Sequence, residues 1–392
     1  MTETADVVIV GGGIVGASIA YHLTSDGCRD VLIVERAAQQ GTGSTGRATG
    51  GVRAQFETDI NVRMSLHSID FFARFREEIG RECGYRAVGY LFFATSDELL
   101  ARLDANRERQ RAAGLRNVRL LTREEVGEML PQMRLEDVRG GVFCPTDGLI
   151  DPPAVMRGLT EAATEHGARV WTDARVTSIE TEDGRVASVE TSRGRVSTRV
   201  VVNAAGAWAG EVARLAGLEL PIVPLRRQLV GVEGFAGMSE SMPMVIDAAS
   251  GFHFRRVERE GRTAAVLLAW PDPAETPGFR EEFDDRFVAK VSALASARVP
   301  SLAGAAVDRS LCRAGLYEMT PDRHAVLGEA PAPRGLFLAC GFSGHGVMHA
   351  PATGRITSDL IMRGRTELVD VEQLGVERFA AGRLIEAEHA LL

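Results

Sequence analysis

A glycine-rich turn near the N-terminus has the residue types and the spacing that bind a pyrophosphate. Residues 11–16 read GGGIVG, which is the pattern G-x-G-x-x-G. In this pattern Gly11 permits a tight turn, Gly13 lets the backbone approach the phosphates, and Gly16 lets the following helix pack closely against the strand. The phosphates would lie at the positively polarised N-terminus of that helix. The turn therefore predicts a nucleotide-binding site.

The elements on either side of the turn are those that this chemistry needs. Residues 7–10 are a continuous β-branched run, typical of a strand buried in a parallel sheet, and apolar residues at helical spacing follow the turn. A second apolar run, residues 31–34, ends at Glu35, where a carboxylate would bind ribose hydroxyls. Strand, turn, helix and acid together favour a dinucleotide site over a glycine turn without a cofactor. They do not distinguish FAD from NAD.

Two further loops favour FAD. Residues 41–56 are rich in Gly, Ser and Thr and end in a charged and aromatic cluster, so their amides and hydroxyls could reach a ribose, a pyrophosphate and a flat ring; the alternative is a flexible surface loop. Residues 335–340 predict a buried strand, which breaks into a second glycine loop at 341–351 before a helix at 352–361. FAD is long, and its isoalloxazine must be held far from the first turn. The late helix would also stabilise negative charge on a reduced flavin.

Six segments in this order resemble the D-amino-acid oxidase superfamily, and within it the branch of sarcosine oxidase and the proline dehydrogenase β-subunit. They are the turn with Glu35, residues 43–56, 147–152, 202–208, 316–322 and 341–351. The resemblance implies an α/β fold, in which a Rossmann-like FAD-binding domain of the glutathione reductase type interleaves with an α+β substrate domain built on an antiparallel sheet. The implied FAD-binding domain comprises residues 1–84, 146–220 and 317–392, and the implied substrate domain comprises residues 85–145 and 221–316.

The resemblance also implies which residues hold the cofactor. Gly315 stands where monomeric sarcosine oxidases carry the cysteine that bonds the flavin, and Cys312 lies three residues too early. We therefore expect non-covalent FAD. The predicted cofactor-binding residues are Gly11, Gly13, Ile14, Val15, Gly16, Glu35, Arg36, Ser44, Thr45, Arg47, Ala48, Thr49, Gly50, Gly51, Val176, Ala205, Gly206, Trp208, Gly315, Gly341, Ser343, Gly344, His345, Gly346, Val347 and Met348.

Flavin-dependent amine oxidation needs little acid–base machinery, because the protein orients the substrate and the cofactor supplies the redox chemistry. Arg53 matches the arginine that grips the substrate carboxylate in the sarcosine oxidase pattern; the alternative is that it staples its loop or pairs with an acid. His253 and Arg255 alternate on a predicted strand, so both could face the ring, although a histidine among aromatics is more often a core residue. Tyr317 could close the pocket or simply pack. With Met348, these are the predicted catalytic residues.

Two departures from the family pattern bear on substrate and electron acceptor. Met348 replaces the lysine that helps bind the carboxylate, which favours a bulkier or less polar substrate. Lys290 is the only lysine and lies in a charged helical stretch, so the family's oxygen-activating lysine has no counterpart near residues 267–270. A missing cation near the flavin should slow the reaction with oxygen. This favours a dehydrogenase with a protein or quinone acceptor over an oxidase.

Composition excludes several classes of protein. The chain has 392 residues, 45% of them hydrophobic and 25% charged, which is ordinary for a soluble globular protein. A formal net charge of −8 gives no sign of a nucleic-acid partner. No apolar run approaches the ~18 residues of a membrane span, and no signal peptide is evident, so we expect a cytoplasmic protein. Five dispersed cysteines predict neither a disulfide framework nor a metal site.

The sequence leaves several functions open. The leading hypothesis is an FAD-dependent oxidoreductase for a small secondary or N-methylated amine or amino acid, such as a sarcosine-, proline- or glycine-like substrate. A 2-hydroxy acid dehydrogenase of the same superfamily needs a similar carboxylate-binding arginine. A non-catalytic flavoprotein that assists assembly is the alternative from another class. The chain could also act as a homo-oligomer or as one subunit of a hetero-oligomer.

Overall fold

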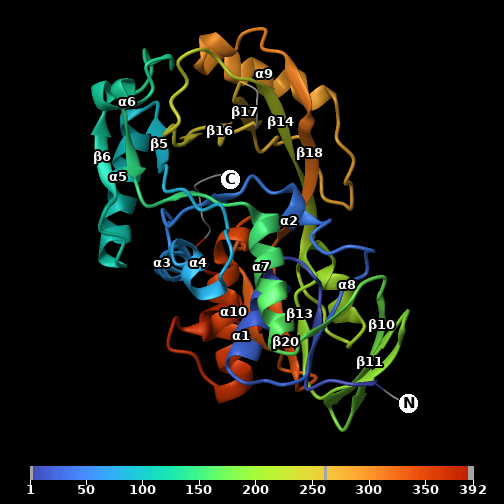
Figure 1. Cartoon of the computed structure of the whole chain (residues 1–392). Helices are drawn as coiled ribbons and strands as arrows, with labels where there is room; N and C mark the ends of the chain where they lie inside the picture. Colours follow the sequence, from blue (N-terminus) through green and yellow to red (C-terminus); the bar gives the residue numbers. More distant parts are fainter. Residues whose placement is uncertain (1–2, 260–262, 387–392) are drawn as a thin grey trace.

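The structure is a computed structural model that describes residues 3–259 and 263–386 (Figure 1). The outermost residues of the predicted FAD-binding domain, 1–2 and 387–392, therefore lie outside the described residues. The helices are α1 (Ile14–Ser25), α2 (Ser44–Arg47), α3 (Asp59–Ala73), α4 (Phe75–Ile79), α5 (Asp97–Ala112), α6 (Arg123–Met129), α7 (Pro152–Glu165), α8 (Ala209–Arg214), α9 (Arg286–Arg298), α10 (Gly346–Arg363) and α11 (Glu377–Ala380), with short 3₁₀ helices at Gly206–Trp208, Pro300–Leu302 and Val371–Leu374.

A six-stranded sheet forms the centre of the cofactor-binding half. Its order is β19-β20-β13-β2-β3-β9, and all neighbours are parallel except the antiparallel pair β19–β20. The strands are β2 (Val7–Val10), β3 (Val31–Val34), β9 (Arg169–Trp171), β13 (Val201–Asn203), β19 (Val326–Glu329) and β20 (Leu336–Cys340). The two apolar runs of the sequence are thus neighbouring strands, buried on both faces as a parallel sheet requires.

The two faces of this sheet pack against different layers. Odd-numbered side chains such as Ile9 and Ile33 join a core with helices α1, α7 and α10. Even-numbered side chains such as Val8 and Leu32 face a second core. That core is covered by α8 and by a four-stranded sheet of order β1-β12-β11-β10, made of β1 (Glu3–Thr4), β10 (Val176–Glu182), β11 (Arg185–Thr191) and β12 (Gly194–Ser197). The period-two alternation of a strand therefore gives a helix–sheet–sheet sandwich.

An eight-stranded sheet forms the other half of the molecule, at the top of Figure 1. Its order is β18-β14-β17-β16-β15-β5-β7-β6, and only the pair β5–β15 is parallel. The strands are β5 (Tyr90–Ala94), β6 (Arg119–Thr122), β7 (Gly140–Cys144), β14 (Val223–Glu233), β15 (Met244–Asp247), β16 (His253–Val257), β17 (Ala265–Ala269) and β18 (Val307–Met319). The sequence prediction of a largely antiparallel sheet over the cofactor fold is confirmed.

Long strands β14 and β18 run from this sheet down to the cofactor-binding half (Figure 1). A two-stranded ladder of β4 (Gly51–Val52) and β8 (Gly148–Leu149) joins two segments of the predicted FAD-binding domain that are far apart in the sequence. The strands of each sheet lie in the segments that the sequence assigned to each domain, except that β18 (Val307–Met319) crosses the predicted boundary after residue 316. We keep the two-domain division, with the boundaries given above, as a proposal.

Local signals in the sequence appear in the structure with small shifts. Asp183 and Gly184 both have positive φ (50° and 72°) at the turn between β10 and β11, as their Asp-Gly hairpin signal requires. Asp151 caps α7 by accepting a hydrogen bond from the amide of Ala154 at 3.1 Å. The late helix, however, begins at Gly346 and not at residue 352, with Pro351 inside it. The predicted start relied on proline as a boundary, but the tertiary packing of α10 against α1 and α3 overrides it.

Candidate active site

A cavity of about 540 Å³ is lined by residues from both large sheets. Most of the predicted cofactor-binding residues line it, and Gly16, Gly341 and Ser343 do not. The predicted residues in its wall are Gly11, Gly13, Ile14, Val15, Glu35, Arg36, Ser44, Thr45, Arg47, Ala48, Thr49, Gly50, Gly51, Val176, Ala205, Gly206, Trp208, Gly315, Gly344, His345, Gly346, Val347 and Met348.

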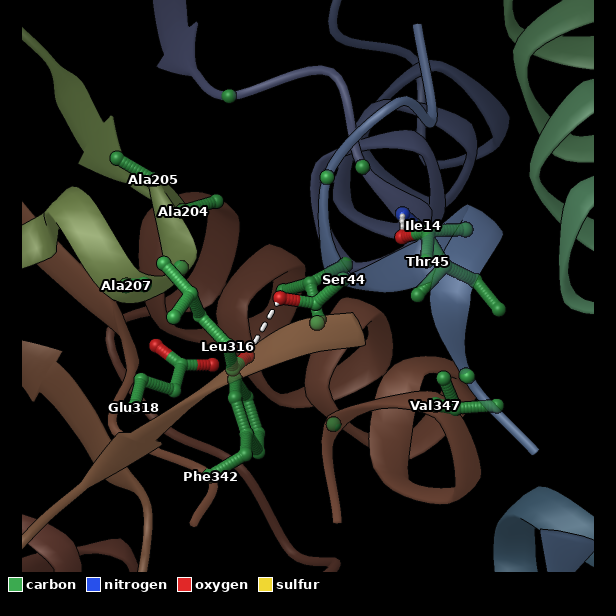
Figure 2. Close-up of a pocket in the computed structure, with 18 of the residues that line it drawn as sticks. Ile14, Ser44, Thr45, Ala204, Ala205, Ala207, Leu316, Glu318, Phe342 and Val347 are labelled. Atoms are coloured by element: carbon green, nitrogen blue, oxygen red, sulfur yellow. Dashed lines mark hydrogen bonds between the residues drawn. The ribbon is translucent and has the colours of Figure 1, made fainter. Parts of the chain in front are cut away.

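The glycine turn at the start of α1 leaves no room for side chains. Gly11 has φ +115°, and a Cβ on it would lie 2.3 Å from the carbonyl oxygen of Ala204. Gly16 lies behind the cavity wall, where a Cβ would be 2.0 Å from the Gly11 oxygen, so it serves helix packing as predicted. The Ile14 amide donates to the Thr45 hydroxyl at 3.0 Å, which joins the 41–56 loop to this turn (Figure 2). The geometry is a cradle for an anion at a helix N-terminus.

Strand β18 passes the same part of the cavity. The Ser44 hydroxyl donates to the Leu316 carbonyl at 2.7 Å, and Glu318 lies close by (Figure 2). Glu318 accepts a hydrogen bond from the Gly341 amide at 2.8 Å, and burial raises the pKa of its carboxyl to about 7. Gly341 thus shapes its loop through Glu318 and does not face the cavity. Sequence reasoning missed Glu318, because no local pattern shows that this strand residue turns toward the cavity.

Ser343, like Gly341, stabilises the loop before α10 and does not line the cavity. It is buried with a positive φ of 51°, its amide donates to the Glu318 carbonyl at 3.1 Å, and its hydroxyl contacts that of Thr320 at 3.2 Å. These bonds fix the loop before α10, so that Gly344 and His345 reach the cavity instead.

Glu35 lies at the far end of the cavity from β16. Its carboxylate accepts hydrogen bonds from the backbone amides of Gly12 and Ala37, both at 2.9 Å. These bonds fix the carboxylate beside the glycine turn, where it can bind ribose hydroxyls as the motif predicts.

Trp208 lies at the same end between two side chains. The Arg36 guanidinium stands 3.5 Å over the indole centroid, and the exposed ring of Phe279 stacks on it at 5.5 Å and 24°. A cation–π contact and a stacked pair fix the indole without burying it in a core. Phe279 belongs to the segment that the sequence assigned to the substrate half, so this contact joins the two halves beside the cavity wall.

One wall of the cavity accommodates a flat group. Arg47 pairs with Glu281 at 2.9 Å and donates to a carbonyl on β18. A Cβ on Gly315 would lie 3.0 Å from the Arg47 Cβ, and one on Gly51 would lie 1.7 Å from the Tyr90 hydroxyl. A side chain at Gly51 would displace the Tyr90 hydroxyl, and one at Gly315 would press on Arg47. Backbone and short side chains form this wall, which suits the close approach of a ring.

Beyond the flat wall, β14 and β16 provide polar side chains. The Nδ1 atom of His253 lies 2.9 Å from the Gly251 carbonyl, which can only accept, so Nδ1 carries the proton and Nε2 is an acceptor. Burial, reinforced by the nearby charges of Arg53 and Arg227, lowers the pKa of His253 to about 4. His253 is therefore a neutral acceptor at pH 7, and it lines the cavity as the sequence predicted.

Tyr317 and Met348 line the same chamber. A Cβ on Gly344 would lie 2.3 Å from the Tyr317 ring, so the tyrosine packs directly on the loop before α10. Burial raises the pKa of Tyr317, which keeps its hydroxyl protonated and able to donate. The guanidinium of Arg227 stands 5.5 Å over the Tyr317 ring. The chamber thus contains a cation, a hydroxyl donor and a neutral imidazole.

Arg53 is placed behind this wall. Its side chain is 0% exposed, it does not line the cavity, and its guanidinium lies 3.9 Å over the Phe56 ring. It donates to the Gln55 carbonyl and lies 3.5 Å from the Nε2 atom of His345, which does line the cavity. The role of Arg53 in binding a substrate carboxylate stays a prediction. In this arrangement His345 lies between Arg53 and the chamber.

Arg255 also lies outside the cavity wall. It shares the His253 face of β16, but its Nη1 donates to the Arg256 carbonyl at 3.0 Å. Burial and the neighbouring charge of Arg313 lower the pKa of Arg255 to about 10. Strand alternation placed it on the correct face, but the strand carries it beyond the end of the chamber.

The structure adds chamber residues that the sequence did not reveal. They come from four strands that are distant in sequence, namely Tyr90 on β5, Arg227 and Leu229 on β14, Met244 on β15 and Glu318 on β18. The signal for Arg227 and Leu229 was their i, i+2 spacing on a predicted strand, which puts both on one face. Which face that is depends on pairing with β18, and pairing is not local information.

These features fit FAD. The glycine cradle suits a pyrophosphate, Glu35 a ribose, and the backbone-lined wall at Gly51 and Gly315 an isoalloxazine. The described part of the chain contains no group of three His, Cys, Asp or Glu side chains that could hold a metal ion. Within residues 3–259 and 263–386, no helix combines the length and hydropathy needed to cross a membrane.

The fold and the cavity together define a flavoprotein with a two-sheet architecture. Comparison with known proteins gives the family: the model described as "FAD dependent oxidoreductase" matches residues 6–360. The chain belongs to this family and uses FAD, and the predicted resemblance is confirmed.

Relatives place the chain within the predicted branch. It is 32% identical to mitochondrial sarcosine dehydrogenase of Mus musculus over 97% of this chain and 42% of that protein. It is 30% identical to mitochondrial dimethylglycine dehydrogenase of Homo sapiens over 96% of this chain and 44% of that protein. The structure of L-proline dehydrogenase from P. horikoshii superposes with a TM-score of 0.90 at 30% identity, covering 98% and 100% of the two chains. The chain spans less than half the length of these two curated relatives.

Proposed function

We propose that this chain oxidises a carbon–nitrogen bond in a small secondary or N-methylated amino acid. FAD held at the glycine turn and the Gly51–Gly315 wall would supply the two-electron oxidising power; the substrate would lose a hydride from the carbon beside its nitrogen, and the resulting iminium ion would hydrolyse in water. Similarity to sarcosine, dimethylglycine and proline dehydrogenases supports this class of substrate.

The observation that carries the proposal is the neutral imidazole of His253 in a chamber with a cation. The Nε2 acceptor would receive the N–H of a secondary amine and so orient it. A histidine with a pKa of about 4 is a weak base at neutral pH, so it positions the amine and does not deprotonate it. The positive charge of Arg227 favours the neutral amine over the ammonium form, because like charges raise the energy of a second cation. Only the neutral amine can release a hydride.

A 2-hydroxy acid is the second candidate substrate, since its O–H could donate to the same Nε2 atom. The two are separated by following the flavin absorbance of purified protein without oxygen. The panel is sarcosine, proline, dimethylglycine, glycine and 2-hydroxyglutarate. Bleaching by an amine alone supports the proposal, and bleaching by 2-hydroxyglutarate alone contradicts it. If no compound bleaches the flavin, the non-catalytic alternative or a missing partner subunit takes its place.

The electron acceptor is tested in the same experiment by readmitting air. Slow recovery of the flavin colour supports the dehydrogenase that the missing lysine favours, and fast recovery supports an oxidase. Lys290 pairs with Asp272 at 2.6 Å and does not line the cavity, in keeping with the first outcome. Arg227, however, brings another cation to the chamber, and a cation near the flavin could replace the missing lysine in promoting the reaction with oxygen.

A partner subunit and a cytoplasmic location belong to the proposal as well. Size-exclusion chromatography of a native extract, followed by detection of this chain, tests whether it travels alone, as a homo-oligomer or with another protein. Fractionation of the same cells tests the location.

A further inference from the structure

Arg227 enters the chamber from the sheet that covers it. On β14, Arg227 and Leu229 line the cavity, whereas Arg226, the residue before Arg227, points the other way and pairs with Glu275 at 2.9 Å. The residue opposite Arg227 on β18 is Gly315, which has no side chain. The space over Gly315 is bordered by the Arg47 side chain, and the Arg227 guanidinium stands 5.5 Å over the Tyr317 ring in the cavity wall.

This guanidinium lacks an anionic partner within the described residues. Among the described residues, Arg227 makes one long hydrogen bond, from Nη1 to the Arg226 carbonyl at 3.4 Å, and its buried Nε has no hydrogen-bond partner. The acids whose charges it feels are Glu275 and Asp272. Glu275 is already held by two other arginines, and Asp272 by Lys290 at 2.6 Å.

A buried cation without a counterion is costly unless a ligand supplies the charge. Burial lowers the pKa of Arg227, which is the consequence of that missing charge. Its planar fork of donors matches a carboxylate in a bidentate arrangement, and Tyr317, over whose ring the guanidinium stands at 5.5 Å, brings a protonated hydroxyl donor to the same chamber. The chamber is thus built to receive one carboxylate at Arg227.

We propose that Arg227, assisted by Tyr317, is the residue that binds the substrate carboxylate. Arg53 is then a positioning residue, which holds His345 and the Gln55 carbonyl in place from behind the wall. The substrate class is an amino acid whose carboxylate is required for binding, not a simple amine. This inference rests on the proposed function only in identifying the ligand as the substrate.

The test measures binding and not turnover, so that it stays independent of the reaction. Cyclopentanecarboxylate and cyclopentanecarboxamide have the same shape, differ in charge and contain no amine to oxidise. Their dissociation constants for the FAD-loaded protein are measured by calorimetry and by the shift of the flavin spectrum. The variants are Arg227→Met, Arg227→Lys and Arg53→Met, with Arg226→Met as a control that removes the same charge from the opposite face of β14.

We expect Arg227→Met to raise the dissociation constant of the carboxylate by about 10²–10³-fold and that of the carboxamide by less than about threefold. Removing one partner of a buried charge pair is costly. Arg227→Lys keeps the charge but loses the fork, and should weaken the carboxylate by about tenfold. It also serves if the methionine variant does not fold. Arg226→Met should leave both constants within about twofold, because Arg226 does not line the cavity and Glu275 keeps its ion pair with Arg280 at 2.6 Å.

Other outcomes overturn the assignment. If Arg227→Met weakens the binding of both probes equally, the residue is structural. If Arg53→Met weakens the binding of the carboxylate alone, the carboxylate subsite is at Arg53. Failure of the wild-type protein to prefer the carboxylate also refutes it. The two proposals can also fail separately. If carboxylate binding depends on Arg227 but no amine bleaches the flavin, the proposed function is contradicted and the carboxylate subsite is retained.

Discussion

The protonation state of His253 is open to a direct thermodynamic test. The side chain is 9% exposed, and its pKa falls from the ordinary value of 6.5 to about 4, chiefly because burial disfavours the imidazolium. In His253→Asn, the amide nitrogen can replace Nδ1 as donor to the Gly251 carbonyl, but the variant has no titrating ring and no Nε2 acceptor. The substitution therefore removes the proton equilibrium while keeping the structural hydrogen bond.

The magnitude follows from linkage. In the unfolded chain His253 binds a proton below about pH 6.5, whereas in the folded chain it stays neutral down to about pH 4. Because the folded-state pKa is lowered, the stability that His253 contributes is complete above pH 6.5 and is lost as the pH falls toward 4. A difference of about 2.5 pH units at about 1.4 kcal/mol each gives about 3 kcal/mol in total. About 2 kcal/mol of this should be lost between pH 7 and pH 5.

The assay is urea unfolding of wild type and His253→Asn at pH 7, 6 and 5, with ΔG from linear extrapolation. Burial also lowers the pKa of His22 to about 4 and that of His349 to about 3, so the wild type should lose more in total. The difference in the free energy of unfolding between the two proteins reports on His253 alone. From pH 7 to pH 5, this free energy should fall by about 2 kcal/mol more in wild type than in the variant. Parallel pH curves for the two proteins would refute the neutral imidazole, and with it the acceptor role in the proposed reaction.

Three further predictions concern the cofactor. Gly11→Ala should be purified without flavin, because its Cβ would lie 2.3 Å from the Ala204 carbonyl at a φ of +115°; the ratio of absorbance at the flavin band to that of the protein measures this. Trp208→Ala should raise the dissociation constant for FAD about 10-fold to 100-fold, through loss of its cation–π and stacking contacts, as followed by fluorescence titration of the apoprotein, and an unchanged constant would show that the indole only packs. Acid precipitation should release all of the flavin into the supernatant, because Gly315 offers no thiol, and colour retained in the pellet would contradict non-covalent binding.

Much of the cofactor site is local, and the sequence by itself determined it. Gly16 must lack a Cβ because the Gly11 carbonyl of the same turn lies in its way, and Glu35 follows the next strand of the same unit, whereas the approach of the Ala204 carbonyl to Gly11 comes from a distant segment. The Asp183–Gly184 hairpin and the Asp151 cap likewise depend on neighbours within a few residues. Such features carry their physical cause in their own sequence.

The substrate chamber was decided by tertiary structure. Arg53 and Arg227 are both arginines in plausible segments, and nothing local shows that one lies behind His345 while the other faces the cavity. Their places depend on the register of β14 with β18 and on the packing of the α10 loop, which join residues far apart in the chain. Shifting a strand by one residue would exchange Arg227 with Arg226. Long-range strand pairing therefore determines the charge and shape of the chamber, whereas short segments of sequence determine the dinucleotide-binding fold.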